Sequence, residues 1–473
     1  MGMIGQRKNS LSSVNCRYNE SMKLNFFCSV FIIFFACVGY GDFQKGTAIR
    51  DAEIEKTLKN YLDPLFTTAG LNPEDSNIVI IIDPAMNAAA LPNNTMLFFT
   101  GFLIGTQTPE EVAGVLAHEV GHIAARHLVR MYSAIDKAQK MSMLGALMGI
   151  AVGMLGSPDA GMAIAMGSSS QALHSFLHYR RSEEEVADML AVKYLEALKW
   201  PIRGLRTFLS KLLGQELLSE SLQDPYLRSH PLTKDRVERI RSKEDAGGTH
   251  YEGKMPPYFQ EQHNRMVAKL KAFLWSTNRT LQTFTGNAIV DLYARSIAYY
   301  RQKDFEKALK ILEELIEKEP KNPFFYEFRG QILFEAGRIA ESIPPYQKAV
   351  DLLPESTLLQ VGLAQSLLQG DDLKAIEKAV CLLKKATHNE KDNGMAWNYL
   401  AIAYGKQNKM GLMAIALAEK GFVTREWRYA LDQANRAKNF SKKGSQIYQR
   451  AEEIEREAQE ASKREKESPL PHH

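Results

Sequence analysis

The stretch Val115-Leu-Ala-His-Glu-Val-Gly-His-Ile-Ala124 interrupts an apolar helical pattern with two histidines and a glutamate. Residues four apart on a helix lie on the same face, so His118 and His122 can both offer an imidazole nitrogen to one metal ion. Glu119 follows His118 directly, which places its carboxylate where it can take a proton from a water molecule at the open coordination position. The pattern predicts a Zn²⁺ site with two histidine ligands and a glutamate base.

The residues before this motif predict where its helix begins. Thr108 is a suitable N-cap, Pro109 occupies the first helical position, and Glu111 stands three residues after the cap. We therefore expect a helix from Pro109 to the region of His127. The third histidine ligand of a metzincin would lie six residues after His122 and needs an intervening glycine, whereas His127 lies five residues after it, so this class is excluded.

Two β-rich stretches precede the helix. Residues 78–82 are all valine or isoleucine and predict a buried strand that Asp83-Pro84 ends. Residues 87–100 have the form of two short strands joined by the turn signal Pro92-Asn-Asn94. A strand beside the zinc helix would form the upper wall of a cleft, and an extended peptide could add to its free edge by main-chain hydrogen bonds. A purely structural hairpin is an equally good interpretation.

A downstream carboxylate is expected as the third ligand. The stretch Ser182-Glu-Glu-Glu-Val-Ala-Asp-Met-Leu-Ala191 supplies candidates within a helical pattern, where Glu184 and Asp188 share one face. Glu184 could reach the metal while Asp188 accepts a hydrogen bond from the distal nitrogen of a ligand histidine and fixes its tautomer. Acidic residues at a helix start also occur because they complement the helix dipole, but the histidine motif favours a metal site.

Length and composition narrow the class of protein. A chain of 473 residues is too long for one core, so two or three domains are expected. Its 45% hydrophobic and 24% charged residues are ordinary for a globular protein, and a net charge of +4 without an RNA- or DNA-binding motif predicts no nucleic-acid partner. Four cysteines are too few and too clustered for a disulfide framework.

The N-terminal region predicts export. Residues 26–38 form an apolar run of 13 residues, which is too short to cross a bilayer comfortably but typical of a secretory signal peptide. We expect synthesis to start at Met22 and cleavage near Gly41; an uncleaved anchor and lipidation at Cys37 are the alternatives. An exported chain left with Cys381 alone fits an envelope compartment such as the periplasm without structural disulfides.

Residues 141–167 are rich in methionine, alanine and glycine. Ser157-Pro-Asp159 divides this segment, and neither half is long enough to span a membrane. Two interpretations are open: a buried helical hairpin over the site, or an exposed apolar loop that contacts lipid or unfolded proteins through flexible methionine side chains. The second would give the protein a peripheral membrane contact.

Repeats follow a boundary marked by Gly247-Gly248 and Pro256-Pro257 and a helical segment over residues 258–275. Pro320 and Pro354 are 34 residues apart, which is the period of tetratricopeptide repeats, and alanine and tyrosine recur in register over four units. The third unit needs about three extra residues. Each unit is a helix pair that buries its seam only by stacking, so several units form a groove for a peptide or protein partner.

The sequence thus predicts a mainly α protein, in which a zincin-like metallopeptidase domain of helices with a small β-sheet precedes an α-solenoid of repeats. The expected organisation is an N-terminal extension and signal peptide over residues 1–41, the metallopeptidase domain over 42–245, a linker helix region over 246–287, tetratricopeptide repeats over 288–422, and a C-terminal helix with a charged tail over 423–473.

In combination, these motifs resemble the M48 family of zinc metallopeptidases. The resemblance rests on the His-Glu-Val-Gly-His motif, on Glu184-Glu-Val-Ala-Asp188 and on Ser229-His-Pro-Leu-Thr233 with Arg236. It extends over about residues 49–422, because an exported branch of the family also carries a repeat tail. It implies one Zn²⁺ per chain, with these roles: His118, His122 and Glu184 as ligands, Glu119 as the catalytic glutamate, and Asp188 as the partner of a ligand histidine.

The resemblance also implies roles outside the zinc motif. A histidine matching His230 lies on a loop that can block the metal site at rest or act on the oxyanion during catalysis, and Arg236 accompanies it. Asn87-Ala88 matches the start of the substrate-binding edge strand of the family. Ala89-Ala90 and Pro92-Asn-Asn94 depart from the usual sequence there, which affects substrate pairing and not the metal site.

We therefore expect an exported zinc metalloendopeptidase that hydrolyses misfolded or stalled envelope proteins, with protein or peptide substrates. The resemblance implies clients among outer-membrane proteins and docking of these clients, or of their assembly machinery, on the repeats. The alternative is a repeat-based chaperone or scaffold for outer-membrane protein assembly with latent protease activity. A multi-spanning membrane protease is disfavoured because the sequence has no stretch of about 20 apolar residues.

Overall fold

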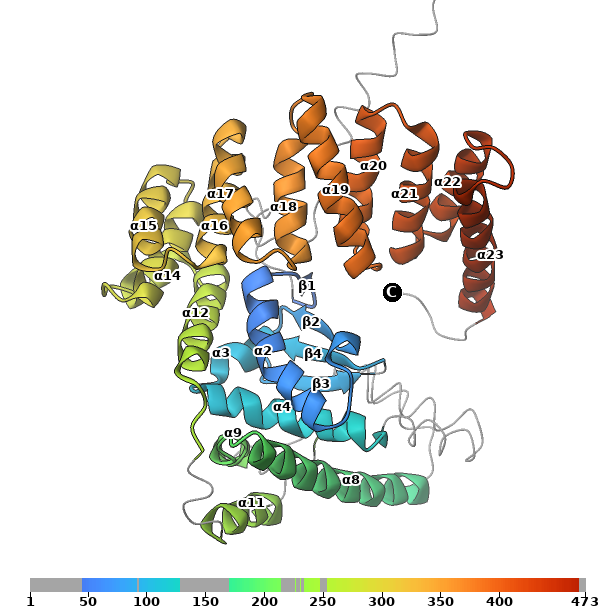
Figure 1. Cartoon of the computed structure of the whole chain (residues 1–473). Coiled ribbons are helices and arrows are strands. Elements are labelled where there is room, and N and C mark those ends of the chain that lie inside the picture. Colours follow the sequence, from blue (N-terminus) through green and yellow to red (C-terminus); the bar gives the residue numbers. More distant parts are fainter. Residues whose placement is uncertain are drawn as a thin grey trace, which may run out of the picture.

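The computed structural model describes residues 45–91, 93–127, 170–213, 226, 230, 234–246 and 253–467. Several expected features lie outside these residues: the leader over residues 1–41, the segment 141–167, Pro92, the neighbours of His230 at 229 and 231–233, and the glycine pair at 247–248. In the described part helices predominate over one small sheet (Figure 1). The predicted fold class, a mainly α chain with a helical solenoid after a small α and β domain, is confirmed.

A four-stranded sheet lies at the centre of the N-terminal domain. Its strands are β1 (Ala48–Ile49), β2 (Asn77–Ile81), β3 (Ala88–Leu91) and β4 (Thr95–Phe99), in the spatial order β1-β2-β4-β3. β2 and β4 are parallel, whereas β1 and β3 run antiparallel to their neighbours. The expected hairpin of β3 and β4 is present, and its turn residues Asn93 and Asn94 have the left-handed φ values of 58° and 54° that asparagine tolerates. β3 is therefore an edge strand.

The described helices around this sheet are α2 (Ala52–Thr68), α3 (Thr100–Gly105), α4 (Pro109–Ala124), α8 (Ser170–Ala197), α9 (Arg203–Leu212) and α11 (Lys234–Ala246), with the short 3-10 helix η1 (Pro73–Asp75) before β2. α4 begins as predicted, because the side chain of Thr108 accepts a hydrogen bond from the backbone N–H of Glu111. Its end differs from the prediction: the helix stops at Ala124, and Arg126 turns the chain with a left-handed φ of 54°.

Two glycines allow α4 to approach its neighbours closely. A Cβ atom on Gly121 would lie 2.9 Å from the carbonyl oxygen of Ala187 in α8, which is closer than atoms pack in proteins. A Cβ atom on Gly114 would lie 2.4 Å from the backbone nitrogen of Leu205 in α9. The backbones of α4 and α8 are therefore in direct contact next to the predicted metal ligands.

The C-terminal half is a solenoid of stacked helices that follows α12 (Pro257–Leu274) and α13 (Thr277–Thr283). Its helices are α14 (Ile289–Arg301), α15 (Phe305–Lys318), α16 (Pro323–Glu335), α17 (Ile339–Leu352), α18 (Thr357–Leu367), α19 (Leu373–Asn389), α20 (Gly394–Lys406), α21 (Met410–Val423), α22 (Trp427–Asn439) and α23 (Gln446–Glu467). α19 has 17 residues, whereas α17 has 14, which accommodates the extra residues expected in the third unit.

Small residues form the seams of the solenoid, as the repeat pattern predicts. The ring of Tyr346 in α17 packs against Gly330 of α16 and Gly362 of α18, where an added Cβ would lie 2.7 Å and 2.9 Å from ring atoms. The ring is 5% exposed. Tyr346 thus joins three successive helices, and a larger residue at either glycine would separate them.

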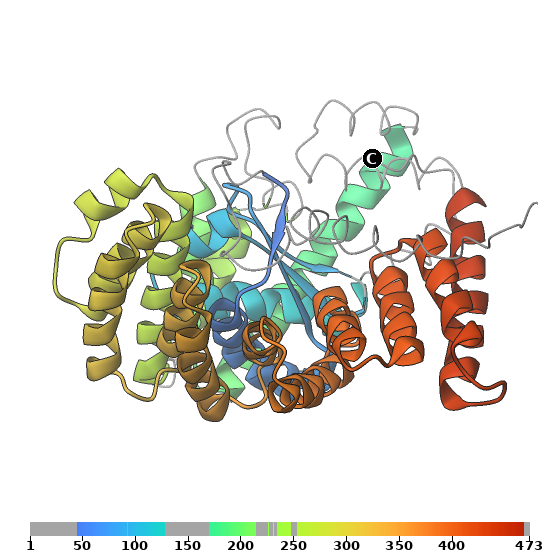
Figure 2. The ribbon, with the colours of Figure 1, turned by 90° about the horizontal axis from the view of Figure 1, so that it is seen from above.

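The solenoid curves over the N-terminal domain, and the beginning of α2 lies against it (Figures 1 and 2). Glu53 of α2 accepts a 2.8 Å hydrogen bond from the Tyr293 hydroxyl and forms an ion pair with Arg265 at 3.0 Å. Asp51 forms an ion pair with Lys269 at 2.8 Å. One hydrophobic core runs from the sheet through α12 into α14, α15 and α16. Polar and apolar contacts therefore hold the solenoid onto the N-terminal domain.

Among the described helices, none is both long enough and apolar enough to cross a membrane.

Candidate metal centre

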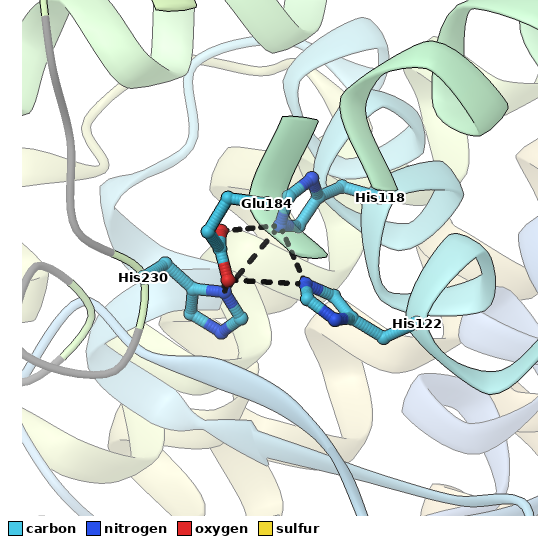
Figure 3. Close-up of side chains that lie close together, drawn as sticks. All are labelled: His118, His122, Glu184 and His230. Carbon is cyan, nitrogen blue, oxygen red and sulfur yellow. Dashed lines mark hydrogen bonds and ion pairs between the residues drawn. The ribbon is translucent and has the colours of Figure 1, made fainter. Parts of the chain in front are cut away.

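Four side chains from three separate parts of the chain meet in the N-terminal domain (Figure 3). His118 and His122 lie on consecutive turns of α4, Glu184 comes from α8, and His230 precedes α11. Their ligand atoms all lie within 4.8 Å of one another. Glu184 is 2% exposed and His118 is fully buried, so the group is removed from solvent. The structure thus brings together the residues that the sequence singled out.

The spacing of these atoms suits a small tetrahedral metal ion. Ligands about 2.0 to 2.1 Å from a tetrahedral Zn²⁺ lie about 3.3 Å from one another. The Nε2 atoms of His118 and His122 are 3.1 Å apart, and the carboxylate oxygens of Glu184 lie 3.2 Å from the first and 3.4 Å from the second. Imidazole nitrogen and carboxylate oxygen are also the donors that Zn²⁺ accepts. Both the distances and the chemistry of the donor set fit this ion.

His118 and Glu184 are held in place by a second layer of charged groups. The Nδ1 atom of His118 lies 2.9 Å from a carboxylate oxygen of Asp188, one turn after Glu184 on α8. Arg236 of α11 binds Asp188 through two hydrogen bonds of 2.7 and 2.9 Å and contacts Glu184 at 3.0 Å. Asp188 thus lies at the distal nitrogen of His118, and Arg236 bridges the two carboxylates.

His230 occupies a fourth position around the same point. Its Nδ1 atom lies 3.1 Å from a Glu184 oxygen and 3.4 Å from His118 Nε2, while its Nε2 atom lies 3.4 Å from an oxygen of Glu119. The ring of Tyr226 stacks on the His230 ring with 4.5 Å between centroids. Tyr226 could not be singled out from the sequence, because a single tyrosine outside a motif gives no sign that it will lie under a site residue.

Glu119 connects the histidine helix to the edge strand. Its carboxylate accepts a 2.9 Å hydrogen bond from the backbone N–H of Ala90 in β3. The predicted strand residues Asn87 and Ala88 lie at the start of β3, but both side chains are buried, at 3% and 1% exposure. The contact with the site therefore falls on Ala90, two residues later than the residues singled out.

Burial and neighbouring charges shift the pKa values of these groups in different directions. Burial would raise the pKa of Glu184, but His230 and His122 beside it hold that pKa well below its usual value. Burial would lower the pKa of His118, yet its hydrogen bonds to two carboxylates raise it to about 10. Burial raises the pKa of Glu119, which makes it a stronger base than an exposed glutamate.

Burial and neighbouring charges also shift the pKa values of Asp188 and His122. Burial would raise the pKa of Asp188, but Arg236 lowers it to about 2, so this carboxylate stays ionised. Burial lowers the pKa of His122, which favours the neutral imidazole that a metal requires.

His127 is a further member of the site. Its Nδ1 atom lies 2.9 Å from the Nδ1 atom of His122, and its side chain is 3% exposed. In the sequence, the position of His127 served only to exclude the metzincin class. The position of His127, five residues after His122, could have indicated a role at the site. Its contact with His122, however, depends on where the helix ends.

The comparisons with known proteins agree with this geometry. Residues 50–244 match the model of peptidase family M48, and residues 293–357 match that of the tetratricopeptide repeat. The chain therefore contains an M48 peptidase domain followed by tetratricopeptide repeats, and it is a metalloendopeptidase. The resemblance found in the sequence is thereby confirmed.

Three relatives are similar to all or part of the described domains of this chain. The beta-barrel assembly-enhancing protease of Escherichia coli K12 is 25% identical over 351 residues, which cover 72% of this chain and 69% of the relative. The putative beta-barrel assembly-enhancing protease of Vibrio cholerae is 23% identical over 411 residues, or 84% and 82% of the two chains. The mitochondrial metalloendopeptidase OMA1 of Arabidopsis thaliana is 28% identical over 195 residues, 41% of this chain and 36% of that one.

Proposed function

We propose that this protein is an exported zinc metalloendopeptidase that hydrolyses misfolded or stalled envelope proteins, as part of outer-membrane protein quality control. The observation that carries the proposal is the convergence of two imidazoles and a carboxylate within 3.1 to 3.4 Å, next to a buried glutamate. The names of the relatives support a role in β-barrel assembly. The apolar run over residues 26–38 supports export to the periplasm.

In this proposal His118, His122 and Glu184 hold one Zn²⁺, which when bound would lower the pKa of a water molecule to about 7 and polarise the substrate carbonyl. Glu119 takes a proton from the attacking water while the oxygen of this water bonds to the carbonyl carbon. Glu119 then gives this proton to the amide nitrogen as the C–N bond breaks. Asp188 holds the His118 ring, because it accepts from the distal nitrogen at 2.9 Å.

The edge strand is the proposed substrate platform. The backbone N–H of Ala90 already reaches the catalytic carboxylate, so a peptide that pairs with β3 would lie directly beside Glu119. Asn87 and Ala88 would define the start of this strand through their backbone, because their side chains are buried. The repeats, expected over residues 288–422, would dock the same clients or their assembly machinery, and the expected peptidase domain over 42–245 would cleave them.

We further propose that His230 blocks the site at rest. Its position 3.1 Å from Glu184 and 3.4 Å from His118 is that of a fourth ligand. Replacing His230 with alanine should raise the rate at which a short quenched peptide is cleaved, because the fourth position becomes accessible. A fall in this rate with unchanged zinc affinity would instead assign His230 to the oxyanion, and an unchanged rate would remove it from the mechanism.

The proposal is tested on the purified chain by metal analysis together with peptide hydrolysis. One zinc ion per chain is expected, with hydrolysis lost on treatment with a chelator and restored by Zn²⁺ and not by Mg²⁺. Protein that folds, yet neither binds zinc nor cleaves peptides, would contradict the assignment.

A second candidate function is a chaperone or scaffold built on the repeats, with latent proteolysis. It is favoured by two contacts that close the site, those of His230 with Glu184 and of Glu119 with Ala90. The Glu119→Gln variant separates the two functions in cells that lack the protein. Full restoration of outer-membrane protein assembly by a variant that cleaves nothing would show that docking is the main activity; failure to restore it would assign the role to hydrolysis.

A further inference from the structure

The two ligand histidines of α4 have different partners at their distal nitrogens. Both direct Nε2 toward the metal site, where these atoms are 3.1 Å apart. The Nδ1 atom of His118 faces the carboxylate of Asp188, whereas the Nδ1 atom of His122 faces the Nδ1 atom of His127 at 2.9 Å. One ligand is therefore supported by a charged group and the other by a second imidazole.

This contact determines where the protons must be. A histidine that binds a metal through Nε2 keeps its lone pair there, so its proton is on Nδ1. The Nδ1–H of His122 must then donate, and the Nδ1 atom of His127 must accept with its own lone pair. A neutral His127 with its proton on Nε2 meets this requirement.

The end of α4 brings His127 into this position. In an uninterrupted helix the fifth residue after His122 would point about 140° away from it around the axis. Instead the helix ends at Ala124, and Arg126 adopts the left-handed φ of 54°, a conformation that costs a non-glycine residue on the order of 1 kcal/mol. The chain turns back, and the His127 ring packs against the His122 ring with 5.0 Å between centroids at 74°.

We propose that His127 is a positioning residue of the metal centre, whose Nδ1 atom accepts a hydrogen bond from His122 and thereby fixes the tautomer and orientation of that ligand. This inference rests on the proposed zinc site and adds to it the support of the second histidine. Partners of this kind contribute about 10-fold to 100-fold to metal affinity in other sites.

Two substitutions separate hydrogen bonding from packing. His127→Phe keeps a ring of similar size without an acceptor, and it should weaken zinc binding by about 10-fold to 100-fold in competition with a chromophoric chelator. His127→Asn places an amide oxygen near the position of Nδ1, and it should retain affinity within about threefold of the wild type. Equal zinc affinity of His127→Phe and the wild type would overturn the proposal. So would an equal loss in both variants when both remain folded by circular dichroism.

A measurement on the wild-type chain tests the proposal if these variants fail to fold. Long-range ¹H–¹⁵N correlation spectra of the zinc-loaded protein report which ring nitrogen of each histidine carries the proton. We expect His122 protonated on Nδ1 and His127 protonated on Nε2. A proton on Nδ1 of His127 would leave no acceptor for His122 and would overturn the inference. The same spectra also show whether His118 and His122 bind zinc. If they do so without the His127 contact, the inference about His127 fails while the proposed metal site stands.

Discussion

The metal centre and the junction between α2 and α12, the helix that leads into the solenoid, are both buried clusters of charged groups, but only at the junction do the buried carboxylates and the cations that they face match in number. At the junction the carboxylates of Asp51 and Glu53 face the cations of Arg265 and Lys269, with contacts of 2.8 to 3.4 Å. Burial raises the pKa of the nearby Glu327, although Lys269 opposes the shift, and this favours the uncharged form of that carboxyl. The junction needs no further ion.

The metal centre has an excess of negative charge. Among the described residues it contains the carboxylates of Glu119, Glu184 and Asp188, the guanidinium of Arg236, and the His118 imidazole, whose raised pKa of about 10 makes it a second cation while it keeps its extra proton. A metal ligand must be a neutral imidazole, so with His118 as a ligand three negative charges face one positive charge, and a divalent cation would neutralise the remaining two. Buried charges without partners are strongly unfavourable, so the charges of the metal centre favour a bound cation, whereas those of the junction neutralise one another.

The largest effect is expected from a substitution that removes one negative charge from the metal centre. Glu184→Gln should lower peptide hydrolysis at least about 10³-fold and abolish the rise in Tm on addition of zinc, because an amide replaces the ionised ligand. Glu185→Gln is the matched control, since this neighbour pairs with Arg239 on the surface and should leave both quantities unchanged. Calorimetry and a fluorogenic peptide assay measure the two effects. Zinc stabilisation that survives Glu184→Gln would mean that the ion binds elsewhere.

Removal of the metal tests how much the excess negative charge of the metal centre destabilises the folded chain. Zinc at 1,000 times its Kd should stabilise the folded chain by about 4 kcal/mol, less whatever it binds in the unfolded chain. Urea unfolding with zinc and with a chelator measures this difference. The junction variant described next should show the same zinc increment as the wild type. If the stabilisation by zinc differs between the junction variant and the wild type, the metal centre and the junction are energetically coupled.

Breaking the balance at the junction should affect folding more than catalysis. Lys269→Met leaves Asp51 buried without its ammonium partner, and a loss of about 3 kcal/mol in the free energy of unfolding is expected. Lys406→Met removes a surface pair with an exposed aspartate, Asp371, and should cost less than about 1 kcal/mol. Hydrolysis per folded molecule should stay within about twofold of the wild type in both variants.

The smallest effect concerns Glu335, whose residue is exposed although its carboxyl group is held by a hydroxyl group in a part-buried contact. Glu335 accepts hydrogen bonds of 2.8 Å from Tyr300, and burial raises its pKa to about 7. The folded state thus binds this proton more tightly than the unfolded state, whose pKa is near 4.5. The stabilisation from Glu335 is complete below pH 4.5 and is lost as the pH rises through 7.

Glu335→Gln cannot ionise, so it should remove this component of the pH dependence. Relative to the wild type, the variant should gain about 1 kcal/mol of stability between pH 5 and pH 8, a value reduced by residual solvent contact. Urea titrations at the two pH values measure the change. Parallel pH profiles for the two proteins would show that Glu335 is already ionised at neutral pH.

Sequence patterns predicted what depends on local chemistry. The start of α4 follows from Thr108 and Pro109, and the pairing of His118 with His122 follows from helical spacing. Glu184 was predicted as a ligand because a site of this kind needs a carboxylate and because Asp188 follows one turn later on the same helix. The repeats were visible because stacking needs small residues at fixed intervals.

What the sequence could not show depends on contacts between distant segments. Asp51 and Lys269 are separated by 218 residues, and each resembles an ordinary surface charge when seen alone. The contact of Ala90 with Glu119 uses a backbone N–H, which every residue except proline carries. His127 reaches His122 only because the helix ends about three residues earlier than expected, and the ends of helices are the least certain part of any sequence interpretation.

The attachment of α2 to the solenoid also bears on how the chain can be divided for experiments. Asp51 caps α2 through the N–H of Ile54 while it holds Lys269, so one carboxylate serves both the first helix of the protease and the helix that leads into the repeats. A fragment cut between them would carry Asp51 and Glu53 into water without their cations and would expose the apolar core that both halves share. The protease without its repeats would then be a different folding unit, and rates measured on it would not describe the intact enzyme.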